Sequence, residues 1–283
     1  MMVEAMEDLE EGVRVGGELL KDVKFADDQA MVAQSENDLQ KLMDVLSKTG
    51  KRYDMKINVM KTKVMRVCRN GSDQEGGNVL KIMIDGEVIE QVKHFRYLGS
   101  LISEDGTCEA EIQGRIAMAK DAFNRRRELL TKHMNRDLKK RIIKSVVWSL
   151  ALYGSETWTL RKKEREKLEA FEMWTWRNME KISWQEHKTN EYVLEAVGEK
   201  RKFLDTIMER KRKWLGHILR GDSLVKDVLE GRLEGRRGRG RPRIMLLDDI
   251  KGEDSYASLK RRAMDRESWK SFIPRTCPRA EHR

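Results

Sequence analysis

The tetrapeptide Phe25-Ala26-Asp27-Asp28 contains the residue types that most directly suggest chemistry. Two adjacent carboxylates lie between apolar runs, where their like charges repel each other. A divalent cation would remove this repulsion, and Mg²⁺ favours carboxylate oxygens together with water and phosphate ligands. Two such ions can stabilise both the attacking and the leaving oxygen of a phosphoryl transfer. The alternative interpretation is a solvated turn in which Asp27 and Asp28 only avoid burial.

Short strands and a helix must position these two acids. Apolar residues in 19–25 and 29–33 predict a hairpin whose turn holds both aspartates. The pattern that follows predicts a helix that begins after Ser35 and ends at Gly50. Further along, residues 94–102 are expected to form one strand.

The pattern changes to helix from residue 107 onward. Apolar residues recur at helical spacing along 112–123, 168–179 and 203–218. Another helix, with Asn135 as its N-cap, is expected to bury one apolar face, made of Leu138, Ile142, Val146 and Leu150. The fold class is therefore α+β, with hairpins and a helix at the N-terminus and a mostly α-helical remainder.

Charge is distributed unevenly along the 283 residues. Residues 1–40 contain eleven of the 48 acidic residues and three of the 58 basic residues. The rest of the chain therefore carries an excess of 18 positive charges. A basic body of this size predicts a polyanionic partner, most often nucleic acid.

Several other classes of protein are disfavoured. The three cysteines, Cys68, Cys108 and Cys277, are far apart and form no motif, which argues against a disulfide framework or a cysteine zinc site. The acidic start lacks the cationic region of a signal peptide, and the best apolar run, 146–153, is too short to cross a membrane. We expect an intracellular protein, nuclear or cytoplasmic, that is not secreted and has no membrane partner.

Short motifs follow one another in an order that resembles a known family, the reverse transcriptase of non-LTR (LINE-type) retrotransposons. The resemblance runs from the family's second catalytic motif to its carboxyl-terminal region, and it implies an RNA-directed DNA polymerase, which is a nucleotidyltransferase. The motifs are FADD (25–28), KINVMKTK (56–63), FRYLGS (95–100), LYGSETW (152–158), WLGHILR (214–220) and RGRPR (239–243).

The resemblance implies roles for individual residues. Asp27 and Asp28 would hold Mg²⁺ at the tip of a palm hairpin, and Asn58 would order the loop before the lysines. A lysine near the incoming triphosphate would neutralise charge or donate a proton, and the YLG segment would grip the primer of an RNA/DNA template–primer. The implied catalytic residues are Asp27, Asp28 and Lys61, and the implied nucleic-acid contacts in this region are Lys63, Tyr97, Leu98 and Gly99.

The same resemblance implies that part of the catalytic centre is missing. The family's polymerase has a further metal-binding aspartate on an earlier strand, and only 24 residues precede Phe25. Asp8 lies in an acidic segment and Asp22 in the hairpin itself, so neither supplies it. We expect a truncated palm without fingers, a remnant starting at an internal methionine that does not polymerise DNA alone. Asp54 stands where the family has glycine, which disfavours a positive-φ turn there.

The expected domains follow from these assignments. Residues 1–104 would form a partial palm and residues 105–230 a helical, thumb-like domain. Residues 231–243 would be a basic Gly/Arg linker, and residues 244–283 a helical tail.

The clusters of basic residues on the expected helices have two interpretations. They contact the nucleic-acid backbone, or they form solvated helix faces. The RGRPR segment resembles the core of an AT-hook that enters the minor groove, and the simpler interpretation is a flexible basic linker. The expected contacts are Arg125, Arg126, Lys139, Lys140, Arg239, Arg241 and Arg243. Three functions therefore stay open: a nucleic-acid-binding reverse transcriptase fragment, a non-enzymatic DNA-binding module, and an inert retroelement remnant.

Tryptophans are frequent in the helical half of the chain. They could stack on bases, but their spacing beside leucine and isoleucine predicts helix-packing core. The residues in question are Trp148, Trp158, Trp174, Trp176, Trp184 and Trp214.

Overall fold

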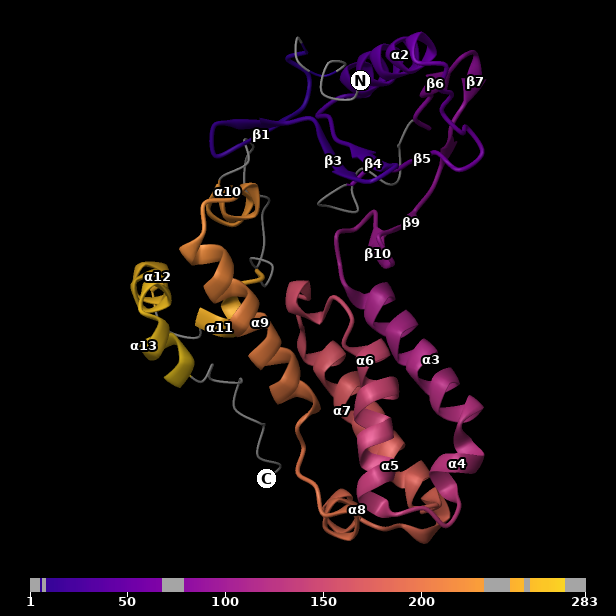
Figure 1. The fold of residues 1–283 in the computed structure, drawn as a ribbon, viewed down its shortest axis with the longest axis vertical. Coiled ribbons are helices and arrows are strands. Elements are labelled where there is room, and N and C mark those ends of the chain that lie inside the picture. The colour runs from indigo at the N-terminus through magenta and orange to yellow at the C-terminus, as the bar shows by residue number, and fades with distance from the viewer. Residues whose placement is uncertain (1–5, 7–8, 68–78, 232–244, 252–254, 273–283) are drawn as a thin grey trace. The chain divides into compact units, whose positions relative to one another are not determined.

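The computed structural model describes residues 6, 9–67, 79–231, 245–251 and 255–272 (Figure 1). They divide into two compact units. One contains the described residues up to Gly106 together with helix α10 (Leu224–Glu230), and the other contains Thr107–Gly221 and the described residues from Met245 onward. All described strands belong to the first unit, which confirms the α+β class with its mostly helical remainder. The domain limits expected at 104, 230 and 243 stay predictions.

The first unit contains only two-stranded sheets in its described part. Four pairs are antiparallel and one, β5 with β8, is parallel. Each pair leaves both outer edges without a further strand. The pairs are β1 (Val13–Val15) with β2 (Glu18–Leu20), β3 (Asp22–Phe25) with β4 (Asp28–Met31), β5 (Lys63–Val64) with β8 (Glu90–Gln91), β6 (Met83–Ile84) with β7 (Glu87–Val88), and β9 (His94–Tyr97) with β10 (Ser100–Ser103).

Helix α2 (Glu36–Arg52) buries Leu42, Met43 and Leu46 in the core of the first unit. Ser35 is its N-cap, as predicted, because the Ser35 hydroxyl accepts a hydrogen bond from the backbone N–H of Asp38 at 3.1 Å. The prediction that Gly50 ends the helix is wrong, because the helix continues to Arg52. Gly50 instead lies inside the last turn, where its carbonyl accepts hydrogen bonds from the N–H groups of Tyr53 and Met55.

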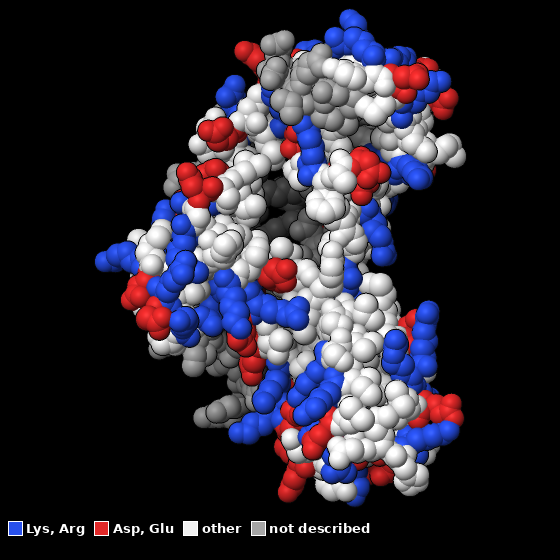
Figure 2. Space-filling view, viewed as in Figure 1, with Lys and Arg blue, Asp and Glu red and all other residues white. Residues whose placement is uncertain are grey.

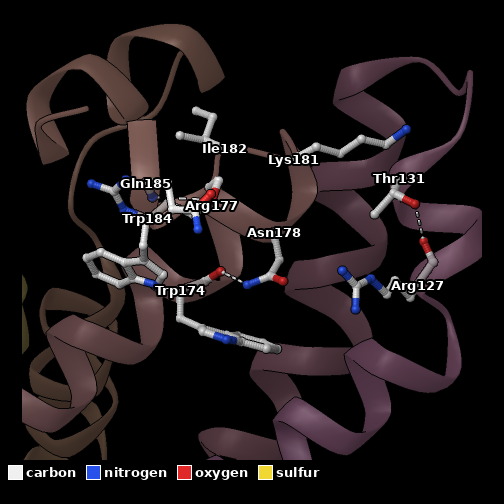
Figure 3. A pocket seen from close by; sticks show the side chains of 10 residues that line it. Arg127, Thr131, Trp174, Arg177, Asn178, Lys181, Ile182, Trp184 and Gln185 are labelled. Carbon is white, nitrogen blue, oxygen red and sulfur yellow. Dashed lines mark hydrogen bonds between the residues drawn. The ribbon is translucent and has the colours of Figure 1, made fainter. Parts of the chain in front are cut away.

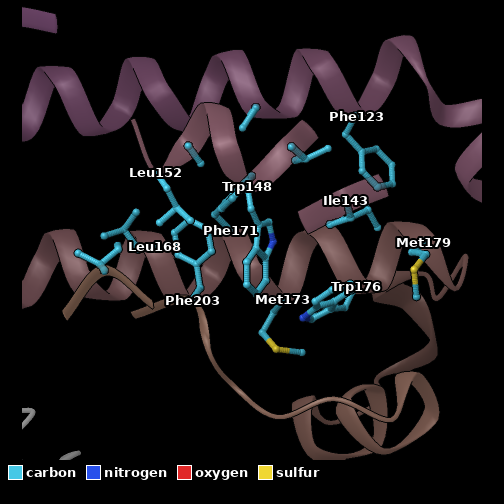
Figure 4. Packing of buried hydrophobic residues seen from close by; sticks show 14 of the residues in the cluster. Phe123, Ile143, Trp148, Leu152, Leu168, Phe171, Met173, Trp176, Met179 and Phe203 are labelled. Atoms are coloured by element: carbon cyan, nitrogen blue, oxygen red, sulfur yellow. The ribbon is translucent and has the colours of Figure 1, made fainter. Parts of the chain in front are cut away.

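The second unit is built from helices around an aromatic core (Figure 4). Trp148 meets Phe203 edge-on at 5.0 Å between ring centroids, and Phe171 meets Phe203 at 5.4 Å. No helix in the described ranges is both long and apolar enough to cross a membrane. The α-helices of this unit are α3 (Glu109–Arg125), α4 (Arg127–Thr131), α5 (Arg136–Ile142), α6 (Trp148–Ala151), α7 (Lys162–Met179), α8 (Asn190–Val197), α9 (Phe203–Arg220), α11 (Asp248–Lys251), α12 (Tyr256–Met264) and α13 (Arg266–Ser271).

A π-helical turn changes which face of one helix is buried. The apolar face expected on Leu138, Ile142, Val146 and Leu150 is wrong, since Leu138 and Leu150 are exposed. The turn Ile143–Val147 separates α5 from α6 and adds one residue to the repeat. The buried positions are therefore Ile143, Val147 and Ala151, each one residue later than predicted.

A carboxylate from α7 replaces the missing N-cap of α9. No side chain next to α9 in sequence caps its first turn. Glu172 Oε1 accepts hydrogen bonds from the N–H groups of Lys202 and Phe203, at 2.9 and 3.3 Å. Glu172 is buried, and this burial raises the pKa of its carboxyl group even though the two N–H groups act in the opposite direction. The interaction fixes the start of α9 against α7.

Asp249 on α11 binds two cations inside the helical unit. Its carboxylate lies 2.9 Å from the Lys211 ammonium of α9 and 2.7 Å from the Arg165 guanidinium of α7. Lys211 also donates to the Trp158 carbonyl at 2.8 Å, and its side chain is 1% exposed. Burial lowers the pKa of Lys211, while Asp249 acts to raise it. The negative charge of Asp249 therefore offsets the cost of burying the Lys211 ammonium away from water.

The last helix packs against α9 through a tryptophan. The Trp269 indole N–H donates to the Arg212 carbonyl at 3.0 Å, and the Arg212 guanidinium donates to the Trp269 carbonyl. The indole lies directly over Gly216, where any side chain would overlap it. The glycine of the WLGHILR motif is thus required by packing.

Replacing Asp249 with asparagine should destabilise the helical unit strongly. Lys211 and Arg165 would keep their charges without the compensating carboxylate, a change that costs about 3–5 kcal/mol at a buried ion pair. Urea denaturation followed by tryptophan fluorescence measures this, since all seven tryptophans lie in the helical unit. The matched control is Glu209→Gln, which breaks the exposed 2.6 Å pair with Lys213 on the same helix and should cost less than about 1 kcal/mol. Equal losses in the two variants would contradict this role of Asp249.

Glu172 should make the helical unit less stable as the pH rises above 4.5. Its pKa in the folded chain is raised above the ordinary value of 4.5, so the folded chain binds this proton more tightly than the unfolded chain. The stability that results is present in full below pH 4.5 and is lost as the pH rises through the folded pKa. Glu172→Gln should remove this decline when the free energy of unfolding is measured at several pH values. A decline of the same size in the variant would assign it to other groups.

Candidate functional site

The FADD hairpin forms, with its turn one residue earlier than predicted. Phe25 pairs with Asp28, so that Ala26 and Asp27 make the two-residue loop between β3 and β4. Ala26 takes the required left-handed conformation, at φ 53°, in place of the usual glycine. Asp27 lies in the loop and Asp28 begins β4, and both residues are exposed.

The described residues do not form a complete metal centre at this hairpin. Asp22, the nearest further acid in the sequence, lies 3.0 Å from the Lys24 ammonium and accepts a hydrogen bond from Gln29 at 2.5 Å. No group of three or more His, Cys, Asp or Glu residues in the described chain is arranged to hold a metal ion. A two-metal site for phosphoryl transfer needs more carboxylate oxygens than Asp27 and Asp28 provide. Asp27 and Asp28 alone therefore do not supply the ligands of such a centre, and no catalytic step follows from them.

Asn58 orders the segment that carries the two lysines. Its side-chain oxygen and its carbonyl both accept a hydrogen bond from the Lys61 N–H at 3.1 Å, and its carbonyl also accepts from Thr62. Lys61 is exposed, whereas the Lys63 ammonium lies 2.5 Å from the Glu90 carboxylate. Lys63 therefore also joins β5 to β8.

Asp54 adopts the conformation that its residue type was expected to disfavour. Its φ is 55°, directly after α2 and its C-cap Tyr53. The expectation was wrong because aspartate, like asparagine, tolerates the left-handed region better than most residues do. The chain reversal before the KIN sequence therefore forms without glycine.

The YLG segment is the turn of a second hairpin. The single strand expected over 94–102 is wrong, because β9 and β10 pair as a hairpin with Tyr97 opposite Ser100. Leu98 and Gly99 form its loop at φ 48° and 78°, which is the twist that a two-residue hairpin turn prefers. Leu98 is 40% exposed at this loop.

Tyr97 joins this second hairpin to the FADD hairpin. Its hydroxyl donates a hydrogen bond of 3.0 Å to the Val23 carbonyl on β3, which is 74 residues away in the sequence. Partial burial and, to a smaller extent, the carboxylates of Asp28 and Asp22 raise the pKa of Tyr97. The two motifs that the sequence connects only by their order are therefore neighbours in space.

The basic residues expected to contact nucleic acid differ in their surroundings. Arg125 pairs with Asp121 at 2.8 Å on the surface of α3, and Arg126 donates to the Ala122 carbonyl. Lys139 is half-buried. Lys140 lies 2.9 Å from Asp137 and donates to the Val197 carbonyl at the end of α8, which leaves its side chain 15% exposed.

On the face shown in Figure 2, lysine and arginine of the helical unit are interspersed with acidic side chains. The remaining expected contacts, Arg239, Arg241 and Arg243, lie outside the described residues.

One tryptophan departs from the prediction of helix-packing core. Trp148, Trp158 and Trp176 are buried as predicted, but Trp184 is 71% exposed. It lies in a short 3₁₀ turn, η4 (Trp184–Glu186), after α7 has ended. Helical spacing does not extend to such a turn, and the polar neighbours Ser183 and Gln185 were the available signal that Trp184 is not core.

Comparison with known proteins gives one informative similarity. An uncharacterized transposon-derived protein of Caenorhabditis elegans is 25% identical to the chain over 211 residues, which cover 74% of this chain and 75% of that protein. No family model matches the chain, and no solved structure matches it. The similarity indicates a transposon origin.

Proposed function

We propose that the chain is the late palm and thumb portion of a non-LTR retrotransposon reverse transcriptase and binds nucleic acid without polymerising it alone. The Tyr97 hydrogen bond to Val23 carries this proposal, because it brings a YLG hairpin against a FADD hairpin. A primer-gripping segment beside an acidic turn is the arrangement that the motif order implies. The transposon-derived relative supports the same origin.

The charge distribution supports binding to a polyanion. The excess of 18 positive charges after residue 40 matches a backbone-binding role for the body of the chain. Exposed Arg126, between α3 and α4, and half-buried Lys139, on α5, are the proposed phosphate contacts. Asp27 and Asp28 would take part in catalysis only with a further carboxylate that the described residues do not place beside them.

The chain should bind a template–primer duplex in a strongly salt-dependent way. Two phosphate contacts are enough to lower the affinity about tenfold between 50 and 200 mM salt. Fluorescence anisotropy should show this loss, and the double variant Arg126→Gln/Lys139→Gln should reduce the salt slope. The control Lys213→Gln/Lys270→Gln removes the same charge from surface lysines of α9 and α13 and should keep the slope. Affinity that does not change with salt would contradict the proposal, and near-total loss on deletion of 231–243 would favour the DNA-binding module instead.

The same chain should not extend a primer. Two adjacent carboxylates do not complete a two-metal centre, so no template-dependent incorporation is expected with Mg²⁺ or Mn²⁺. A primer-extension assay with labelled nucleotides measures this directly. Incorporation that disappears in Asp27→Ala would overturn the view that the chain is catalytically incomplete.

A further inference from the structure

A cavity of about 690 Å³ lies within the helical unit, between α4, the end of α7 and η4 (Figure 3). Three cationic side chains line it, those of Arg127, Arg177 and Lys181. Two indole rings line it as well, and no Asp or Glu is among the described residues that form its wall. None of the sequence motifs contains this combination of flat rings and positive charge.

The exposed ring of Trp184 is held from one side. The Arg177 guanidinium carbon lies 4.7 Å from the centroid of this ring. Arg177 is itself only 4% exposed, and its Nη2 donates to the Lys188 carbonyl at 2.7 Å and to Asn190 Oδ1 at 3.1 Å. Its buried Nε has no hydrogen-bond partner. A fixed cation therefore supports one face of an indole that is 71% exposed.

The second indole, Trp174, is fixed by the core. Its ring meets Phe123 edge-on at 5.2 Å, and the Lys120 ammonium lies 5.1 Å from its centroid. Asn178 donates a hydrogen bond of 2.8 Å to the Trp174 carbonyl, and its amide also lines the cavity (Figure 3). The cavity thus offers aromatic surface, two side-chain amides and the exposed cations Arg127 and Lys181.

This chemistry matches an unpaired base next to a phosphate. Indole and guanidinium planes stack on any base, and the cations that line the cavity attract the backbone. A base within a duplex already stacks on its neighbours and cannot enter. We propose that the cavity binds single-stranded nucleic acid, with one base on Trp184 and a flanking phosphate at Arg127 and Lys181. The proposal rests on the proposed function and adds to it the strand type and the binding position.

The test compares an oligothymidylate with an abasic strand of equal length, which carries the same phosphates without bases. In fluorescence anisotropy with the full chain, Trp184→Ala should weaken binding of the oligothymidylate about tenfold and leave the abasic strand unaffected. Trp184→Phe keeps an aromatic plane and should restore most of the affinity. The matched control is Tyr192→Ala, which removes another exposed ring with a cation above it, Lys188 at 4.7 Å, and should change neither affinity.

The phosphate contacts have a separate readout. Arg127→Gln/Lys181→Gln should weaken both strands equally, because both strands carry the same phosphates. If Trp184→Ala leaves oligothymidylate binding unchanged, or weakens the two strands equally, base stacking at this cavity is excluded. If the wild-type chain binds neither these strands nor a duplex, the proposed function itself fails, which is a different result from binding that does not depend on Trp184.

Discussion

The helical unit depends on a single carboxylate placed among cations away from water. Asp249 compensates Lys211, which without it would be a buried charge of high energetic cost. Because Arg165 binds the other oxygen of the Asp249 carboxylate, Asp249 also joins α7, α9 and α11. The aromatic core supplies the contact area, and the ionic cluster links α7, α9 and α11 within it.

The first unit is organised by local pairing. Its described sheets have two strands each, and an isolated pair of strands is marginally stable without a partner surface. Helix α2 provides such a surface for the strands near residues 64 and 84. The FADD hairpin instead keeps Phe25 63% exposed and has Tyr97 as its long-range hydrogen-bond partner. The two adjacent aspartates and exposed strand edges are therefore found at the same place in the chain.

Much of the secondary structure could be predicted from the sequence, because the signals were local. The Ser35 cap, the buried face of 168–179 and the hairpin around Asp27 follow from short-range patterns. The predictions that failed depended on features that a pattern of residue types does not show. A π turn shifts the helical repeat by one residue without any marker residue, and Leu98 occupies a left-handed conformation that usually selects glycine. The cavity beside Trp184 was not predictable, since it combines residues from helices and a turn that only folding brings together.

The docking of α11–α13 has a consequence for truncation of the chain. Asp249 and Trp269 hold these helices against α9 through an ion pair with Lys211 and hydrogen bonds with Arg212. Loss of the helices would leave the Lys211 ammonium without its carboxylate and would uncover the backbone of Gly216 beneath the indole. A chain shortened before α11 would therefore carry an uncompensated cation in its helical unit.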